Sequence, residues 1–353
     1  MPETLLAADV GASKTLVALV GPQPGGWAWL TLPQRFATPR DPAAAAALIS
    51  QVARDLAGDQ RTVAAAAVAI PGPLDRDRGI VTLLANLGWH DVPFAAMLAG
   101  QLGVPVVLDD DARLGALGEW SVGAGRGARS LGYVTVSSGI GCGLVLDGEP
   151  WAGGHGVAGE FGHLVLDTSG PRCGCGHRGC VEAYAGGLAL ARAARRAWPR
   201  ARLGDGTPAP RSAAEVFRLA RRGDAAAARI VGEATGALAL GLAAIGAVFD
   251  PELIVVGGSV ALGQRRWIRS VAAASRRRCI AQTGASMRVV TAALADHSAL
   301  AGAAELAARR WYGRTGDGGG DGGGERGVQG RGVVAEDRGI GRVVDHPVPL
   351  ELI

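Results

Sequence analysis

Apolar runs separated by glycine-rich turns define the predicted elements in the first half of the chain. Residues 5–20 have the pattern of a strand, a turn of small residues and a second strand, and residues 132–148 repeat this pattern. Shorter apolar runs at 63–70 and 104–108 are typical of buried strands, whereas residues 41–57 and the segment DARLGALGEW have helical composition. Two similar hairpins about half a chain apart suggest a duplicated fold.

The second half contains predicted helices at 181–198, 213–221, 225–248 and 298–311, and a buried strand at 253–257 that leads into a glycine turn. The longest uncharged run, residues 234–249, falls short of the ~20 residues that a membrane span needs, and we interpret it as a buried helix. Residues 313–353 are a predicted flexible Gly-rich tail, because the segment GDGGGDGGGERG buries too little surface to fold.

The composition is that of a soluble globular protein large enough for two domains. The chain has 353 residues, 48% of them hydrophobic, and a formal net charge of +4. The pI of about 9.0 comes from dispersed arginines. Aromatic residues make up 5% of the chain without a repeated basic–aromatic pattern, so we expect no nucleic-acid partner. An apparent strand follows Met1 without a basic leader segment, which favours a cytoplasmic protein with no membrane partner.

Both hairpin turns have the composition of a phosphate-binding loop. In the first turn, Asp9 and Lys14 flank Gly11, Ala12 and Ser13, whose small side chains let backbone N–H groups approach an anion. The second turn has the sequence SSGIG. One such turn is more often a plain hairpin, but the pair favours phosphate binding, with a nucleotide held between two halves.

Three consecutive carboxylates, Asp109, Asp110 and Asp111, follow a predicted strand and precede a predicted helix. Acidic residues at a helix N-terminus interact favourably with the helix dipole, and we interpret Asp109 as the N-cap. Three carboxylates exceed what capping requires. Because ligands bind at the carboxyl ends of strands in α/β folds, we expect a ligand site here.

Three of the five cysteines lie close together, as Cys173, Cys175 and Cys180. Thiolates at this spacing suit one tetrahedral zinc ion, which requires a fourth ligand. The alternative is a glycine-rich turn with free thiols. A filled four-ligand zinc site is structural, because it has no open position for chemistry.

Three histidines near these cysteines compete for the fourth position: His155, His163 and His177. His177 lies inside the cysteine loop, where the chain would have to fold back sharply. His163 comes from outside the loop and would attach it to the preceding segment, so we expect His163 to be the ligand. Glu160 and Glu182 are then two carboxylates beside a rigid loop.

Eight segments are similar to a known family: DVGASKT, PGPLD, NLGW, LDDDARLGALGEWSVGAGRG, SSGIGCG, GEFGH, CGCGHRGCVE and IVVGGS. On these segments, over residues 5–311, the chain resembles the repressor–ORF–kinase (ROK) sugar kinases of the actin-like ATPase superfamily, which includes hexokinase and Hsp70. The resemblance implies an α/β fold of two actin-like ATPase domains with ribonuclease-H-like halves. The implied lobes are 1–112 and 113–312, the second with a zinc-clipped loop at 163–182, and the last helix is free to return to the first lobe.

The resemblance also implies an ATP-dependent hexose kinase with Mg²⁺ and a structural Zn²⁺, commonly a homodimer or homotetramer. Asp111 would be the general base that takes the proton from the sugar 6-hydroxyl as its oxygen attacks the γ-phosphate. The implied nucleotide residues are Asp9, Gly11, Ser13, Lys14, Thr15, Ser138, Gly139, Gly257 and Gly258. The implied sugar residues are Gly72, Asn86, Asp110, Glu160, His163 and Glu182. The implied zinc ligands are His163, Cys173, Cys175 and Cys180.

The catalytic turn departs from the family sequence Asn-Asp-Ala-Asn, because this chain has Asp110, Asp111, Ala112 and Arg113 there. The first Asn of the family contacts the sugar near its 3- and 4-hydroxyls, so Asp110 places a negative charge at that position. An ammonium group on the sugar would gain a charge-assisted hydrogen bond. We therefore favour an amino sugar, 3-amino-3-deoxyglucose (kanosamine), whose kinases in this family act in antibiotic biosynthesis. The alternative is that Arg113 pairs with Asp110 at i,i+3 spacing and neutralises it, which leaves an ordinary glucokinase.

Two further alternatives stay open. One is a kinase for N-acetylmannosamine or N-acetylglucosamine, and the other is a non-catalytic sugar-binding regulator. Family repressors carry a winged helix-turn-helix before the first phosphate strand, and here that strand begins within the first residues, so we expect no DNA-binding domain. The presence of Asp9 and Asp111 favours an enzyme, because binding alone requires no base.

Overall fold

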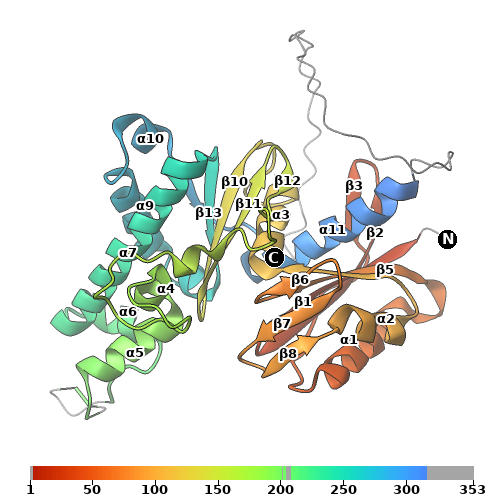
Figure 1. Ribbon diagram of the computed structural model, residues 1–353, viewed down its shortest axis with the longest axis horizontal. Helices are drawn as coiled ribbons and strands as arrows, with labels where there is room; N and C mark the ends of the chain where they lie inside the picture. The colour runs from red at the N-terminus through yellow and green to blue at the C-terminus, as the bar shows by residue number, and fades with distance from the viewer. Residues whose placement is uncertain (1–2, 201, 204–207, 316–353) are drawn as a thin grey trace, which may run out of the picture.

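The computed structural model describes residues 3–200, 202–203 and 208–315, with side chains up to residue 312. Two large sheets form the framework of a mixed α/β fold, and Figure 1 shows each sheet with its own set of helices. The predicted Gly-rich tail began at residue 313, but residues 313–315 still belong to the last helix, and the remainder from 316 onward lies outside the described residues.

The first predicted hairpin forms the centre of a six-stranded sheet with the order β3-β2-β1-β5-β9, in which β4 also pairs with β2. β1 pairs antiparallel with β2 and parallel with β5, which in turn pairs parallel with β9. Since β1 and β9 run in the same direction, the carboxylates at their C-terminal ends lie at one edge of the sheet. The strands are β1 (Thr4–Val10), β2 (Lys14–Gln23), β3 (Gly26–Trp29), β4 (Gln34–Ala37), β5 (Val63–Ile70) and β9 (Val106–Asp110).

Helices cover both faces of this sheet. Successive side chains of β1 point to opposite faces, and both sets are apolar, so each face packs against its own helices. Leu6 and Ala8 pack in the core with α1 and α2, whereas Leu5 and Ala7 pack in the core with α3 and α11. The helices are α1 (Pro42–Ala57), α2 (Phe94–Leu102), α3 (Asp111–Ser121) and α11 (Ser298–Thr315). The 3₁₀ helices η1 (Gly58–Gln60) and η3 (Ala295–His297) follow α1 and precede α11.

A small antiparallel sheet stands beside the first one and was not predicted from the sequence. It consists of β6 (Leu74–Asp75), β7 (Ile80–Leu84) and β8 (Trp89–Val92). Trp89 and Leu84 belong to the same core as α1 and α2. This sheet therefore extends the first half of the molecule toward the cleft described below.

The second hairpin is part of a five-stranded sheet with the order β12-β11-β10-β13-β14. Its hairpin pairs antiparallel and its β10–β13–β14 segment is parallel, which repeats the pattern of the first sheet. The strands are β10 (Leu131–Val136), β11 (Ile140–Leu146), β12 (Glu149–Pro150), β13 (Leu253–Gly257) and β14 (Val289–Thr291).

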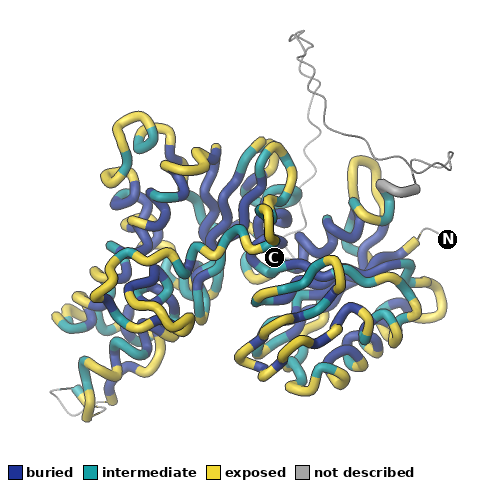
Figure 2. Tube along the Cα trace, in the orientation of Figure 1, coloured by how far each residue is buried: buried dark blue, intermediate teal, exposed yellow. Residues whose placement is uncertain are grey.

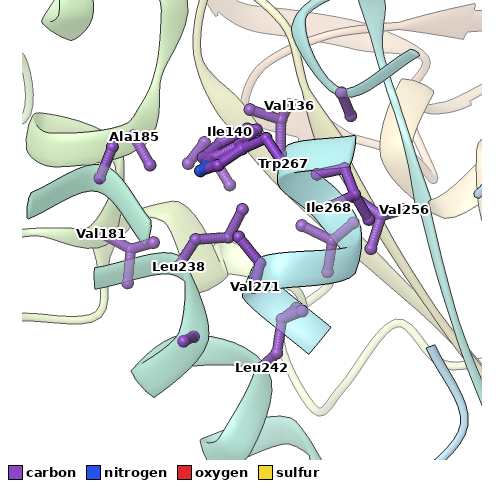
Figure 3. Packing of buried hydrophobic residues seen from close by; sticks show 14 of the residues in the cluster. Val136, Ile140, Val181, Ala185, Leu238, Leu242, Val256, Trp267, Ile268 and Val271 are labelled. Carbon is purple, nitrogen blue, oxygen red and sulfur yellow. The ribbon is translucent and has the colours of Figure 1, made fainter. Parts of the chain in front are cut away.

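Helices of the second half bury one large apolar core against this sheet. Figure 3 shows side chains from α4, α7, α9 and strands β10 and β13 gathered in this core, with Trp267 and Val271 contributed by α9. The elements are η2 (Glu160–His163), α4 (Val181–Ala185), α5 (Gly187–Ala197), α6 (Ala213–Arg221), α7 (Ala225–Phe249), α8 (Ser259–Gly263), α9 (Arg265–Arg276) and α10 (Ala281–Ser286).

The helix α7 contains the longest uncharged run, residues 234–249, and begins nine residues before it, at Ala225. It has 25 residues and a mean hydropathy of 1.6, so by length and composition alone it could cross a membrane. However, 56% of its most apolar window is buried in the protein, and Leu238 and Leu242 lie in the core of the second half. The expected buried helix is therefore present, although its last residues, Val248 and Phe249, are exposed. Figure 2 shows buried (dark blue) and exposed (yellow) segments along the helices of this half.

The helices α3 and α11 pack closely against each other between the two sheets. The carboxylate of Glu119 on α3 is completely buried and accepts hydrogen bonds from the N–H groups of Ala124, Ala293 and Leu294 and from the hydroxyl of Ser298, at 2.7 to 3.1 Å. α11 also packs on β1 and β5 of the first sheet. The exact division of the chain into lobes at residue 112 stays a prediction.

Two local predictions differ from the structure. The predicted helix 181–198 is divided into α4 and α5, because Gly186 between them has extended backbone angles. The interpretation of Asp109 as a helix N-cap is wrong. Asp109 belongs to β9, and Asp110 is the N-cap, with its carboxylate accepting from the N–H groups of Ala112 and Arg113.

Candidate active site

A cleft of about 1040 Å³ is lined by residues of both large sheets and of the small sheet. Thr15 and Gly257 are not among its lining residues; the Thr15 side chain is buried and its hydroxyl lies 2.8 Å from that of Thr38. The predicted site residues that do line it are Asp9, Gly11, Ser13, Lys14, Gly72, Asn86, Asp110, Asp111, Ser138, Gly139, Glu160, His163, Cys175, Glu182 and Gly258.

The turn between β1 and β2 forms one wall of the cleft. The N–H of Gly11 donates to the carbonyl of Lys14 at 2.9 Å, which closes a tight turn. The ammonium group of Lys14 lies 2.8 Å from the carboxylate of Asp296 in η3. Burial raises the pKa of Asp9 to about 7, although the charge of Lys14 opposes this and that of Asp296 adds to it. A cation bound at Asp9 would therefore favour its ionised form.

The turn between β10 and β11 lies against the start of α5. The N–H groups of Gly187 and Leu188 donate to the carbonyls of Ser137 and Ser138 at 2.8 and 3.0 Å. A Cβ atom at position 139 would lie 2.4 Å from a carboxylate oxygen of Glu182, so a larger residue in place of Gly139 would displace that carboxylate from its present position. The small side chains of this turn thus leave its backbone accessible from the cleft.

Asp111 begins α3 and lines the cleft. Burial raises the pKa of Asp111 well above the usual range of an aspartate, and the charges of Asp110 and Asp9 raise it further. The hydrogen bond from the N–H of Ala112 lowers this pKa but does not cancel the increase. A carboxylate with a raised pKa and access to a cleft is suited to accept a proton.

Asp110 combines a structural contact with a half-buried position in the lining of the same cleft. Its Oδ1 accepts from the backbone N–H groups of Ala112 and Arg113 at 3.1 and 3.0 Å, which caps α3. Burial raises its pKa to about 6, although the N–H and the charge of Arg113 oppose this. The guanidinium group of Arg113 binds Asp109 instead, with Nε 2.8 Å from Oδ1. The side-chain pair of Arg113 and Asp110 at i,i+3 spacing, which was the alternative interpretation, is therefore not formed, and Arg113 pairs with Asp109 at i,i+4 spacing.

The three predicted cysteines and His163 form a compact cluster. Their ligand atoms all lie within 4.8 Å of one another. Cys173 Sγ is 3.6 Å from Nδ1 of His163, and Cys175 Sγ is 3.7 Å from Cys180 Sγ. Ligand atoms around a tetrahedral zinc ion are separated by roughly 3.3–3.8 Å, so the donor set and these two spacings fit zinc. His177 also lies near Cys175, at 3.6 Å, but is not part of this mutually close set.

The cysteine–histidine cluster adjoins the predicted sugar residues. Nδ1 of His163 faces the cysteines, while its Nε2 is 3.8 Å from the carboxylate of Glu160. Glu182 accepts from the N–H of Ile140 at 2.9 Å, at the start of β11. Gly72 belongs to the opposite wall, where its φ of 104° and the proximity of the Leu83 carbonyl exclude a side chain. Carboxylates and an imidazole of this kind can bind several sugar hydroxyls at once.

Comparison with known proteins identifies the family. The ROK family model matches residues 5–310. The chain belongs to the ROK family. A glucokinase from Streptomyces coelicolor is 30% identical over 86% of this chain and 96% of the relative. An N-acetylmannosamine kinase from Yersinia pestis is 34% identical over 76% of this chain and 87% of the relative.

Two solved structures of ROK proteins have the same fold. A ROK hexokinase from Thermus thermophilus is 34% identical, with a TM-score of 0.73 over 89% of this chain and 100% of that chain. A ROK family glucokinase from Streptomyces griseus, in complex with glucose and AMPPNP, is 30% identical, with a TM-score of 0.70 over 86% of this chain and 99% of that chain. The resemblance to the ROK sugar kinases of the actin-like ATPase superfamily is thereby confirmed.

Several charged residues in the ROK cleft or behind it were not predicted as site residues. Asp296 holds Lys14, and Arg192 on α5 lines the cleft beside the second turn. Arg76 lies 2.9 Å from the buried carboxylate of Asp109. The ion pair of Asp109 and Arg113 could have been predicted from the sequence, because the two residues have i,i+4 spacing. The other contacts join segments far apart in the chain, for which a single sequence carries no signal.

Proposed function

We propose that this ROK protein is an ATP-dependent hexose kinase that transfers the γ-phosphate of ATP to the 6-hydroxyl of glucose or a glucose-type sugar. The observation that carries the proposal is the half-buried carboxylate of Asp111, whose pKa is raised by desolvation, in the same cleft as two turns suited to phosphate. The glucokinase relatives and the glucokinase complex with glucose and AMPPNP support ATP as donor and glucose as acceptor.

In the proposed reaction, Asp111 accepts the proton of the 6-hydroxyl while the hydroxyl oxygen forms a bond to the γ-phosphorus. The bond from that phosphorus to the β,γ-bridging oxygen breaks, and ADP leaves with the electron pair. Such a transfer requires mainly positioning and charge stabilisation. The β1–β2 and β10–β11 turns would hold the phosphates, and Asp9 would hold Mg²⁺, which supplies positive charge beside them. Asp9 fits this role, because its buried carboxylate lacks a close cationic partner other than Lys14 among the described residues.

A coupled ADP-release assay with MgATP tests the function directly. The acceptors are glucose, kanosamine, N-acetylglucosamine and N-acetylmannosamine, and the last covers the alternative that the Yersinia pestis relative supports. Asp111→Asn should lower kcat by roughly 10²- to 10⁴-fold, because it removes the base, while sugar binding persists. Asp224→Asn is the matched control, since this carboxylate caps α7 outside the cleft. Sugar binding by the wild-type protein without turnover on any acceptor would favour the non-catalytic regulator.

We propose further that the acceptor is an amino sugar, with kanosamine favoured. Asp110 lines the cleft, and its carboxylate makes no side-chain pair with Arg113, whose guanidinium is bound to Asp109. Its negative charge is thus available to an ammonium group, with which a hydrogen bond is roughly twice as strong as with a neutral hydroxyl. The paired alternative, in which Arg113 neutralises Asp110 by direct contact, lacks that contact in the described structure.

Asp110→Asn removes the negative charge and keeps the helix cap, because asparagine also caps helices well. The variant therefore tests the charge alone. The variant should lose the preference for kanosamine over glucose by about tenfold or more, which corresponds to ~1.4 kcal/mol. The measurement is kcat/KM for both sugars in the wild type and the variant. An unchanged ranking of the two sugars would reject the amino-sugar acceptor and leave glucose as the substrate.

The cysteine cluster is proposed to hold a structural zinc ion. The four donors His163, Cys173, Cys175 and Cys180 complete a tetrahedral set, which leaves no open position for substrate. A zinc ion there would fix the ring of His163 and with it the position of Nε2 near Glu160. The proposed role of the metal is therefore to shape the acceptor end of the cleft.

A further inference from the structure

A buried group of charges lies behind the acceptor end of the cleft. Asp109 is completely buried and contacts two guanidinium groups. Nε of Arg113 donates to its Oδ1 at 2.8 Å, and Nη2 of Arg76 lies 2.9 Å from its Oδ2. Arg113 is only 2% exposed, and its Nη2 donates to the carbonyl of Gly156 at 3.3 Å. We call these four residues the Asp109 cluster.

The Asp109 cluster joins three segments that each carry predicted acceptor residues. Arg76 lies in the turn between β6 and β7 of the small sheet, which adjoins the wall formed by Gly72 and Asn86. Gly156 begins the cleft-lining segment that ends at Glu160. The central carboxylate immediately precedes the two aspartates of the catalytic turn. The contacts of the Asp109 cluster therefore connect the three segments that surround the proposed acceptor position.

We infer that Arg113 is a positioning residue for the acceptor, whose guanidinium holds the segment ending at Glu160 against the turn that carries Asp111. The inference rests on the proposed kinase function. Arginine suits this task because its planar fork binds a carboxylate and a carbonyl simultaneously, whereas lysine offers one compact ammonium group on a flexible chain. The β1–β2 turn proposed for the donor phosphates belongs to a separate segment, so the effect falls on the acceptor.

A purely stabilising role explains the Asp109 cluster less well. Nη1 of Arg113 and Nε of Arg76 are buried without a hydrogen-bond partner among the described protein atoms. A buried ion pair with incomplete hydrogen bonding contributes little net stability, because the cost of desolvation offsets the attraction. The position that the cluster gives to the acceptor segment is the better explanation for its presence beside the cleft.

Steady-state kinetics of Arg113→Lys test the inference, because lysine keeps the charge beside Asp109 and loses the second contact to Gly156. We expect the KM for the acceptor sugar to rise roughly tenfold, as the loss of precise positioning predicts, and the KM for ATP to stay unchanged. Arg113→Met also removes the charge and should raise the acceptor KM at least as much. Thermal unfolding of each variant verifies that it is folded at the assay temperature.

Arg309 provides a matched control away from the cleft. Its Nε donates to Glu305, four residues earlier, at 2.6 Å, and its Nη1 donates to the carbonyl of Gly148 at 3.2 Å, the same pair of contacts that Arg113 makes. Arg309→Lys should leave both KM values unchanged. The inference is overturned if Arg113→Lys raises both KM values equally or neither, or if Arg309→Lys has the same effect.

Direct measurement of sugar binding separates this inference from the proposed function. If the wild-type protein phosphorylates none of the sugars, the proposed function fails. Calorimetric titration of the same variants with glucose and kanosamine then still decides the role of Arg113. A weaker sugar affinity in Arg113→Lys, with unchanged affinity in Arg309→Lys, supports the positioning role, and equal affinities reject it.

Discussion

Asp110 and Asp111 are adjacent in the sequence, yet their surroundings differ. Two backbone N–H groups bind Asp110 and favour its ionised form, and its pKa is nevertheless raised by burial to about 6. The pKa of Asp111 is raised well above the usual range by burial, then by the charges of Asp110 and Asp9. Two carboxylates in different environments can thus divide the work, one held ionised for binding and one suited to proton transfer.

The raised pKa of Asp111 predicts the direction of the pH dependence. Asp111 must be ionised to accept a proton, so kcat/KM should fall with decreasing pH through an apparent pKa above the ordinary value of about 3.9. Asp110→Asn removes a negative neighbour, favours ionised Asp111 and should move this acid limb to lower pH by about half a unit or more. Asp224→Asn should leave it in place. A pH–rate profile of Asp110→Asn with an unmoved or higher acid limb would show that another group titrates.

The helix α3 connects the turn that carries Asp110 and Asp111 to the rest of the molecule. Its first residue is Asp111, and near its end Glu119 receives four hydrogen bonds, from the turn after α3, from the segment before η3 and from the start of α11. Within that junction, η3 begins with Ala295 at a φ of 54° and holds Asp296 against Lys14. Asp111 and the β1–β2 turn are thus connected through α3 and the segment that leads into α11.

Elements with strong local patterns were predicted well from the sequence. The β1–β2 and β10–β11 hairpins, β5 and α6 lie where the alternation of apolar residues and the turn residues place them. The amphipathic pattern of α9, with Trp267, Ile268 and Val271 on one face, was readable but not predicted. The small sheet was missed because its strands are short, and their hydrogen bonds depend on neighbouring elements.

The site was predictable where its residues lie in motifs and not where it depends on distant contacts. The cysteines and His163 come together as the sequence suggested. In contrast, the pair of Lys14 and Asp296 joins residues 282 positions apart, which no local spacing reveals. The partner of Arg113 was decided by burial of Asp109 in β9, which the sequence alone did not distinguish from a helix cap.

The cleft takes groups from both halves of the molecule, and in the proposed function the β1–β2 turn serves the donor whereas the segments around the cysteine cluster serve the acceptor. The first sheet provides Asp9 and Lys14 at the β1–β2 turn. The second half provides Glu160, His163 and Glu182 from the segments around the cysteine cluster. Removal of one group of contacts should therefore change one ligand's affinity more than the other's.

Loss of the proposed zinc ion should weaken sugar binding more than nucleotide binding. Elemental analysis should find about one zinc per chain in the wild type and little in Cys173→Ser. Because the metal orients His163 near Glu160, its loss should weaken glucose affinity by roughly tenfold or more. Affinity for AMPPNP should fall less, since the β1–β2 turn does not depend on the metal. Cys279→Ser, outside the cluster, is the control, and calorimetry measures both ligands. Equal losses of both affinities, or a wild-type protein without metal, would contradict the proposed role of zinc.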